Sequence, residues 1–156
     1  MSIVGLISDT HGLLRAEAIA ALQGCDLIIH AGDVGDGGII ESLQALAPAT
    51  VVRGNIDQGS WAASWPATAT VEAGRVRICV LHDIHQLRVD PAKSGVDVVV
   101  SGHSHKPTRS EHEGVLYINP GSAGPRRFGL PITVARLDLR AKPWNVEFVD
   151  LSRPRE

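Results

Sequence analysis

Seven side chains that can bind a metal ion come shortly after apolar runs of the sequence. They are Asp9, His11, Asp33, Asn55, His82, His103 and His105. In α/β sheets, ligands bind in the crevice at the carboxyl ends of the strands. If these runs form strands that end at a common edge, oxygen and nitrogen ligands from distant parts of the chain converge on one crevice.

Two short segments each offer a pair of these ligands. Asp9-Thr10-His11 and His103-Ser104-His105 place them two residues apart, and in extended backbone such side chains project to the same side. Seven ligands are too many for one tetrahedral ion. They suit two ions that share a carboxylate, a centre that stabilises the attacking and leaving oxygens of a phosphoryl displacement. Two divalent ions and two aspartates leave a charge of about +2, which attracts phosphate.

Each ligand taken singly has a simpler explanation. Asp9 is placed to cap a helix, Asp33 and Asn55 suit turns, and His82 suits a core position. The two histidines of Gly102-His103-Ser104-His105 are more specific, because such a pair at a strand end is rarely structural filler. The joint occurrence of all seven favours a metal site. Ligation without thiolate fits Mn²⁺, our first expectation, and also Fe²⁺, Zn²⁺, Ni²⁺ or Co²⁺.

The elements that would position these ligands alternate in the first half of the chain. Apolar runs predict strands over 2–8, 26–31 and 50–53, with helices over 13–22 and 38–46 between them. This order implies parallel strands with right-handed crossovers. Residues 55–68 are predicted to form a loop. Beyond it, we predict an antiparallel set of strands. It consists of hairpins over 70–81 and 108–119, a buried strand over 97–101, and strands over 132–138 and 145–149.

The composition suits one globular domain over residues 1–156. Apolar residues make up 44% and charged residues 21%, enough for a substantial core. No run approaches the ~18 apolar residues of a membrane span, and the start lacks the basic region of a signal peptide. We therefore expect a cytoplasmic protein with no membrane contact, in which Cys25 and Cys79 are reduced. The net charge of −2 argues against a general nucleic-acid-binding protein.

The chain resembles the calcineurin-like metallophosphoesterase superfamily in motifs between residues 8 and 122. They occur in the order Ser8-Asp9-Thr10-His11-Gly12, Gly32-Asp33, Gly54-Asn55-Ile56-Asp57, His82, Gly102-His103-Ser104-His105 and Asn119-Pro120-Gly121-Ser122. The short length and the Gly-Asn-x-Asp form are most similar to its small branch, which holds YfcE-type bacterial and archaeal phosphodiesterases and the retromer subunit Vps29. The resemblance implies an α/β fold, a four-layer αββα sandwich of two mixed β-sheets flanked by helices.

The resemblance also implies a role for each ligand. By position, Asp9, His11 and His105 resemble ligands of a first metal ion, and Asn55, His82 and His103 resemble ligands of a second. Asp33 resembles the carboxylate that bridges the two. In the family, a metal-bridging hydroxide attacks phosphorus in line, without a covalent intermediate. The implied function is a dinuclear phosphodiesterase or phosphatase acting on a small phosphoester, with Asp33, Asn55, His82 and His103 in the catalytic set.

The sequence departs from the family in two places. Larger relatives have a histidine after the asparagine, proposed to protonate the leaving group; here Ile56 leaves Asp57 as the nearest proton donor, or none. The branch usually has His-Gly-His at the fifth motif, where this chain has His82-Asp83-Ile84-His85. Asp83 is expected either to orient a ligand or to pair with a neighbour, and His85 is out of register. His30 and His112 match no motif, which favours core or surface positions.

Two other functions remain open. One is a Vps29-like scaffold, in which the fold serves protein interaction and the metal site has decayed; the seven intact ligand positions favour catalysis instead. A nuclease has little support, because Arg126-Arg127-Phe128 and Arg153-Pro154-Arg155 are typical of solvated surface. Trp61 and Trp65 are expected to pack under a loop, although they could also stack on a nucleobase or mark a contact between copies of a homo-oligomer.

Overall fold

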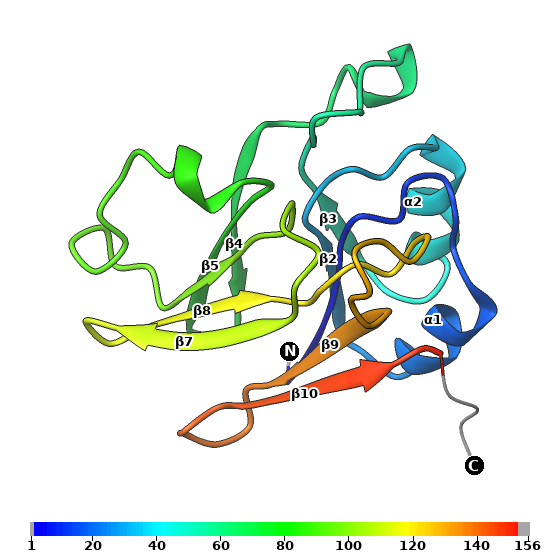
Figure 1. Cartoon of the computed structure of the whole chain (residues 1–156). Coiled ribbons are helices and arrows are strands. Elements are labelled where there is room, and N and C mark those ends of the chain that lie inside the picture. The colour runs from blue at the N-terminus through cyan, green and yellow to red at the C-terminus, as the bar shows by residue number, and fades with distance from the viewer. Residues whose placement is uncertain (1, 153–156) are drawn as a thin grey trace.

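A computed structural model describes residues 2–152, which form two five-stranded mixed sheets packed face to face (Figure 1). The first sheet contains β1 (Ile3–Ile7), β2 (Leu27–His30), β3 (Ala49–Val51), β9 (Thr133–Asp138) and β10 (Asn145–Asp150). The second contains β4 (Thr68–Ala73), β5 (Val76–Leu81), β6 (Val98–Val100), β7 (Thr108–His112) and β8 (Val115–Asn119). Their strand orders are β10-β9-β1-β2-β3 and β4-β5-β6-β8-β7. The two mixed sheets confirm the predicted α/β class.

The first half of the chain forms the predicted crossover unit. β1, β2 and β3 are parallel neighbours, and α1 (Ala16–Ala21) and α2 (Gly37–Gln44) connect them. The carboxylate of Asp36 caps α2 by accepting from the Gly38 amide at 2.9 Å. α1 is shorter than the predicted 13–22, because Arg15 has extended backbone and is its N-cap, and Leu22 is its C-cap.

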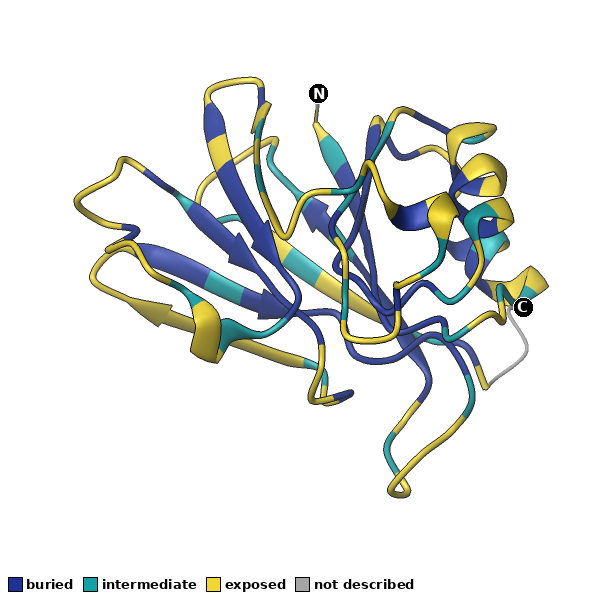
Figure 2. Ribbon diagram, turned by 90° about the horizontal axis from the view of Figure 1, so that it is seen from above, coloured by how far each residue is buried: buried dark blue, intermediate teal, exposed yellow. Residues whose placement is uncertain are grey.

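The core has two layers of similar size, one between the two sheets and one between the first sheet and its helices, and a smaller layer on the outer face of the second sheet. Alternation along the strands separates these layers: Val4 and Leu6 of β1 face the second sheet, whereas Ile7 packs with α1 and α2. Figure 2 shows buried strands in the middle and exposed residues on the outward faces of the helices. This packing makes the sheets a rigid base for the loops at their ends.

Two parts of the sequence-based topology are wrong. β9 and β10 do not join the second sheet; they pair as a hairpin and extend the first sheet by antiparallel pairing of β9 with β1. The second sheet is not wholly antiparallel, since β6 is a parallel neighbour of both β5 and β8. Both α-helices described lie on the first sheet, so the expected outer layer of the second is reduced to a loop with the 3₁₀ turn η2 (Ile84–Gln86).

The 55–68 segment is a loop, as predicted, with one 3₁₀ turn, η1 (Ser60–Ala62). Trp61 and Trp65 pack edge to face there, with ring centroids 5.3 Å apart. Trp65 also packs against the core beneath α2, while 39% of Trp61 stays exposed. Among the described residues, no helix is long and apolar enough to cross a membrane. The basic piece Arg153-Pro154-Arg155 lies outside the described residues.

Candidate metal centre

The loops after β1, β2, β5 and β6 bring five of the seven predicted ligands together. Asp9, His11 and His105 form one group and Asp9, Asp33 and His82 another. Within each group, one potential ligand atom per residue lies within 4.8 Å of those of the others. The reason is topological, because parallel neighbours end at the same edge and the two sheets present these edges side by side.

Two carboxylates lie at the middle of the cluster. Asp33 Oδ2 is 3.5 Å from His11 Nε2 and 3.2 Å from His82 Nε2, so one oxygen lies between imidazoles of both groups. Asp9 Oδ1 is 3.3 Å from His105 Nε2, 3.7 Å from His11 Nε2 and 3.9 Å from His82 Nε2. A carboxylate in such a position can bridge two ions.

Buried polar atoms at the centre of the cluster have no hydrogen-bond partner. These are Asp9 Oδ1, His11 Nε2 and His82 Nε2. Each unpaired buried polar atom lowers the stability of the fold by about 1–3 kcal/mol. A cation bound among these three atoms would give each of them a partner. The donor set of carboxylate oxygen and imidazole nitrogen fits divalent transition metals. The residues present therefore fit the metal ions expected from the sequence.

The charges of the cluster are coupled. Burial alone would raise the pKa of Asp33, but the His82 imidazole, whose Nε2 lies 3.2 Å from Asp33 Oδ2, outweighs it and lowers this pKa to about 2. The pKa of Asp9 is also lowered, because His11, His82 and Ser8 outweigh its burial. His82 has a raised pKa despite its burial, since it faces both carboxylates. Both aspartates are thus ionised at neutral pH and ready to bind cations.

Neighbouring groups fix the orientation of the ligands. His82 Nδ1 donates to Ala31 O at 2.8 Å, which turns Nε2 towards Asp33. Ser8 Oγ donates to Asp9 Oδ2 at 2.7 Å, which leaves Oδ1 free to face the histidines. Such outer hydrogen bonds set the orientation of metal ligands and tune their basicity.

The backbone is unusual at the ligands themselves. Five ligand positions have positive φ angles, 55° at Asp9, 47° at His11, 54° at Asp33, 70° at His103 and 63° at His105. Two glycines allow the loops to approach this closely. A Cβ at Gly54 would collide with the backbone and carboxylate of Asp33, and one at Gly102 with the Ser8 hydroxyl and the Asp9 carboxylate.

His103 and Asn55 lie at the open side of the cluster. Neither is among the five residues of the two groups. His103 is 46% exposed at its side chain, and its ring centroid is 5.2 Å from that of His82. Its Nε2 lies 3.9 Å from Asp83 Oδ2, whereas Asp83 Oδ1 lies 3.1 Å from His85 Nδ1, so the contacts of Asp83 favour the expected pairing with a neighbour. Asn55 is exposed and lines a small cavity together with His82.

Asp57 occupies a position that does not suit a proton donor. Only 1% of it is exposed. Its Oδ2 accepts from Val34 N at 3.2 Å and Gly54 N at 2.9 Å, and its Oδ1 accepts from Gly35 N at 3.0 Å. A carboxylate held by three backbone amides ties the Asp33 loop to the Asn55 loop. These contacts suit a positioning role for Asp57, and its catalytic role stays a prediction.

His30 also joins two ligand loops, a role that the sequence did not reveal. The ring is fully buried; its Nδ1 accepts from Gly32 N at 3.1 Å, and its Nε2 donates to Thr10 Oγ1 at 3.0 Å. Thr10 Oγ1 in turn donates a hydrogen bond to Val34 O at 2.8 Å. Burial lowers the pKa of His30 to about 4, so the ring is neutral at neutral pH. His112, by contrast, is a surface residue.

Phe128 is a second residue whose position was not predicted. Its ring centroid lies 6.2 Å from that of His105, although 84% of the residue is exposed. The nearby charge of Arg127 adds to burial in lowering the pKa of His105. The piece Arg126-Arg127-Phe128, predicted to be plain solvated surface, therefore borders the metal centre. Only the fold could reveal this, since the segment lies more than twenty residues from His105 in sequence.

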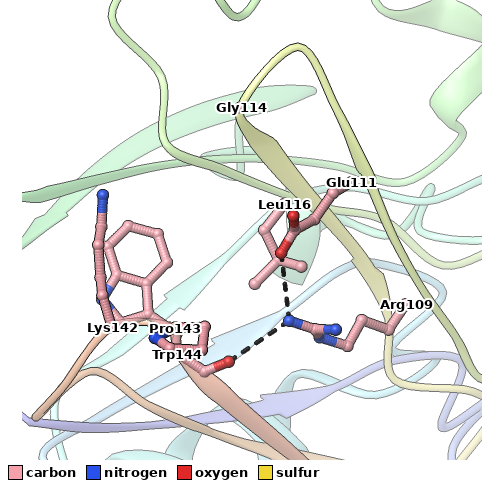
Figure 3. Close-up of a pocket in the computed structure, with 7 residues that line it drawn as sticks. All are labelled: Arg109, Glu111, Gly114, Leu116, Lys142, Pro143 and Trp144. Carbon is pink, nitrogen blue, oxygen red and sulfur yellow. Dashed lines mark hydrogen bonds and ion pairs between the residues drawn. The ribbon is translucent and has the colours of Figure 1, made fainter.

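A cavity of about 380 Å³ lies at the other end of the sandwich (Figure 3). It is lined by Arg109, Glu111, Gly114, Leu116, Lys142, Pro143 and Trp144. Three lining residues, 142–144, lie in the loop after β9. Asp138 at the end of β9 pairs with Ile3 at the start of β1, whereas Asp9 follows the opposite end of β1. None of its lining residues is a predicted ligand. Arg109 spans it by donating to Glu111 Oε1 at 3.3 Å and to Trp144 O at 3.5 Å.

Comparison with known families gives a match over most of the chain. The model of the calcineurin-like phosphoesterase superfamily domain matches residues 1–142. A probable metallophosphoesterase of Methanothermobacter thermautotrophicus is 35% identical over 149 residues, covering 87% of this chain and 86% of the relative.

Solved structures share the same fold. One described as a novel archaeal phosphodiesterase superposes with a TM-score of 0.78 at 28% identity, covering 94% of this chain and 99% of that one. Vps29 from Chaetomium thermophilum superposes with a TM-score of 0.76 at 19% identity, covering 95% of each chain. The second likeness, at such low identity, concerns the fold alone.

Proposed function

The chain belongs to the calcineurin-like phosphoesterase superfamily, and we propose that it is a phosphodiesterase that works with two divalent metal ions. Membership makes it a metallophosphoesterase; the number of ions and the diester preference are the proposed part. The observation that carries the proposal is the position of Asp33, whose Oδ2 lies within 3.5 Å of imidazole nitrogens on both sides. An oxygen shared in this way suits a pair of ions better than a single one.

The ligands divide between two ions around Asp33. Asp9, His11 and His105 would hold the first ion, and His82, Asn55 and His103 the second. When bound, the ions lower the pKa of coordinated water and neutralise charge on the phosphate oxygens. Among the metals that fit these ligands, Mn²⁺ is the first candidate.

The protein's own groups position the substrate and the ligands. The amide of Asn55 can donate to a phosphate oxygen from the open side, next to His82. Ser8 orients Asp9 through a hydrogen bond of 2.7 Å. Of the two residues after Asn55, Ile56 has no proton to give and Asp57 is buried and bound to backbone amides, so neither is placed to protonate the leaving group. This favours phosphoesters with good leaving groups.

A test combines metal analysis with hydrolysis of bis-p-nitrophenyl phosphate in added Mn²⁺. We expect two equivalents of metal in the wild type, and in His82→Ala fewer equivalents with at least a hundredfold loss of rate. His112→Ala, altered at an exposed histidine, is the matched control and should keep both. Undiminished hydrolysis by His82→Ala would refute the proposal.

The scaffold alternative rests on the likeness to Vps29. It predicts that the metal-loaded protein hydrolyses no phosphoester. The ionised, unpaired ligand atoms at the centre of the cluster favour catalysis, because a surface used only for protein contact has no need of them. Cytoplasmic location, a single domain over 1–156 and self-association stay predictions.

A further inference from the structure

A small cavity adjoins the proposed second metal position. It measures about 130 Å³ and is lined by Arg53, Gly54, Asn55, His82 and Gln86. Two of these residues, Asn55 and His82, are proposed ligands of the second ion. A group that occupies this cavity would therefore lie beside a phosphate bound at the metal centre.

The lining of this cavity has the charge of an anion site. It contains no carboxylate, and Arg53 is its only group with a permanent charge. Within residues 2–152, the Arg53 guanidinium has no ion pair, whereas Arg77, Arg109 and Arg140 each pair with a nearby acid. The side-chain amides of Asn55 and Gln86 can add further hydrogen-bond donors.

There is room for a larger molecule on the far side of Arg53. A second cavity, of about 290 Å³, shares Arg53 and continues along Asp57, Gln58, Gly59, Ser60, Ala62 and Ala63. Arg53 thus stands between the metal centre and a separate hollow. A guanidinium in such a place can hold a carboxylate or phosphate with two parallel hydrogen bonds.

We propose that Arg53 forms a subsite for a second anionic group of the substrate, next to the scissile phosphate. The inference rests on the proposed phosphodiesterase function and narrows its substrate class. The scissile phosphate of a diester carries one negative charge, which the metal ions attract. The free cation at Arg53 then selects diesters whose retained ester group bears a carboxylate or a further phosphate.

The test measures binding of two small phosphonates to the Mn²⁺-loaded protein by calorimetry. Propylphosphonate carries only the phosphonate, whereas 3-phosphonopropionate adds a carboxylate at the end of a chain of similar length. We expect the wild type to bind 3-phosphonopropionate roughly five- to tenfold more tightly, as for a partly exposed charge-assisted contact. Arg53→Gln should remove this preference and leave the affinity for propylphosphonate unchanged.

A matched control and a second readout separate the alternatives. Arg75→Gln, in the turn between β4 and β5, should keep the wild-type preference. Ethyl and 2-phosphonoethyl esters of p-nitrophenyl phosphate, which share one leaving group, should show the same selectivity in KM. If Arg53→Gln still prefers 3-phosphonopropionate, the carboxylate binds the metal and not Arg53. If Arg53→Gln binds both phosphonates equally more weakly, Arg53 contacts the scissile phosphate. Either result overturns the proposed subsite. Absence of hydrolysis of any diester by the wild type would instead refute the phosphodiesterase proposal.

Discussion

Replacing Asp57 by asparagine removes a buried charge that three backbone amides share. The amides of Val34 and Gly54 point at one carboxylate oxygen, and that of Gly35 points at the other. An asparagine oxygen can keep the first pair, but its NH₂ group then faces the Gly35 N–H. Each buried donor left unpaired costs about 1–3 kcal/mol, so we expect a loss of about 3 kcal/mol in the free energy of unfolding.

Denaturant unfolding of the metal-free protein measures this loss. For a chain of this size, about 3 kcal/mol lowers Tm by roughly 6–12 °C. Asp36→Asn is the control, because Asp36 binds a single amide on the surface and asparagine caps helices equally well. A change of less than about 1 kcal/mol in Asp57→Asn, with slower hydrolysis of esters with poor leaving groups only, would show that Asp57 donates a proton.

Two further predictions concern His30 and Gly102. Because burial lowers the pKa of His30 to about 4 in the folded state from an ordinary 6.5, the unfolded chain binds the extra proton between these values. The free energy of unfolding should therefore be highest above pH 6.5 and fall by up to ~3 kcal/mol towards pH 4. Unfolding curves of His30→Asn across this range should show a smaller fall. An equal fall would contradict the lowered pKa of His30. In Gly102→Ala, the added methyl group would collide with Ser8 and the Asp9 carboxylate, so we expect roughly tenfold or more weaker Mn²⁺ binding in a metal titration. Gly114→Ala, at an open turn, should bind Mn²⁺ as the wild type does.

The sequence predicted the strands well because their residues are apolar and β-branched in runs of strand length. Ile3–Ile7, Val76–Leu81 and Val98–Val100 all lie within predicted strands. The sequence did not predict how the strands pair. Alternation assigns a face to each side chain, but it does not decide which neighbouring strand a strand such as β9 pairs with. It pairs with β1, where Val134 and Ala135 fill the two faces of the first sheet.

The candidate ligands that the structure brings together could be proposed from the sequence because their chemistry is local to short motifs. Asp9 and His11 can be recognised as candidate ligands by their residue types and by the apolar run that precedes them. The residues that support them act through contacts made only in the fold. Asp57 reaches amides twenty-three and twenty-two residues away, and Phe128 meets His105 through a loop whose path no pattern describes.

The cost of the site argues for its use. Non-glycine residues with positive φ are uncommon, and each stores about 1 kcal/mol or more, somewhat less for aspartate and histidine. Five such residues and four unpaired buried atoms occur within one cluster, in a domain whose total stability is of the order of 10 kcal/mol. A chain selected only for folding or for protein contact would gain by replacing Asp9 or His11 with residues that relax the loop. Divalent ions bound at the cluster would stabilise the folded state and offset this cost, since they bind the folded state and not the unfolded one. We therefore expect Mn²⁺ to raise Tm in the wild type and to raise it much less in His11→Asn, and equal shifts in the two proteins would remove the reason to regard the strained loops as a metal site.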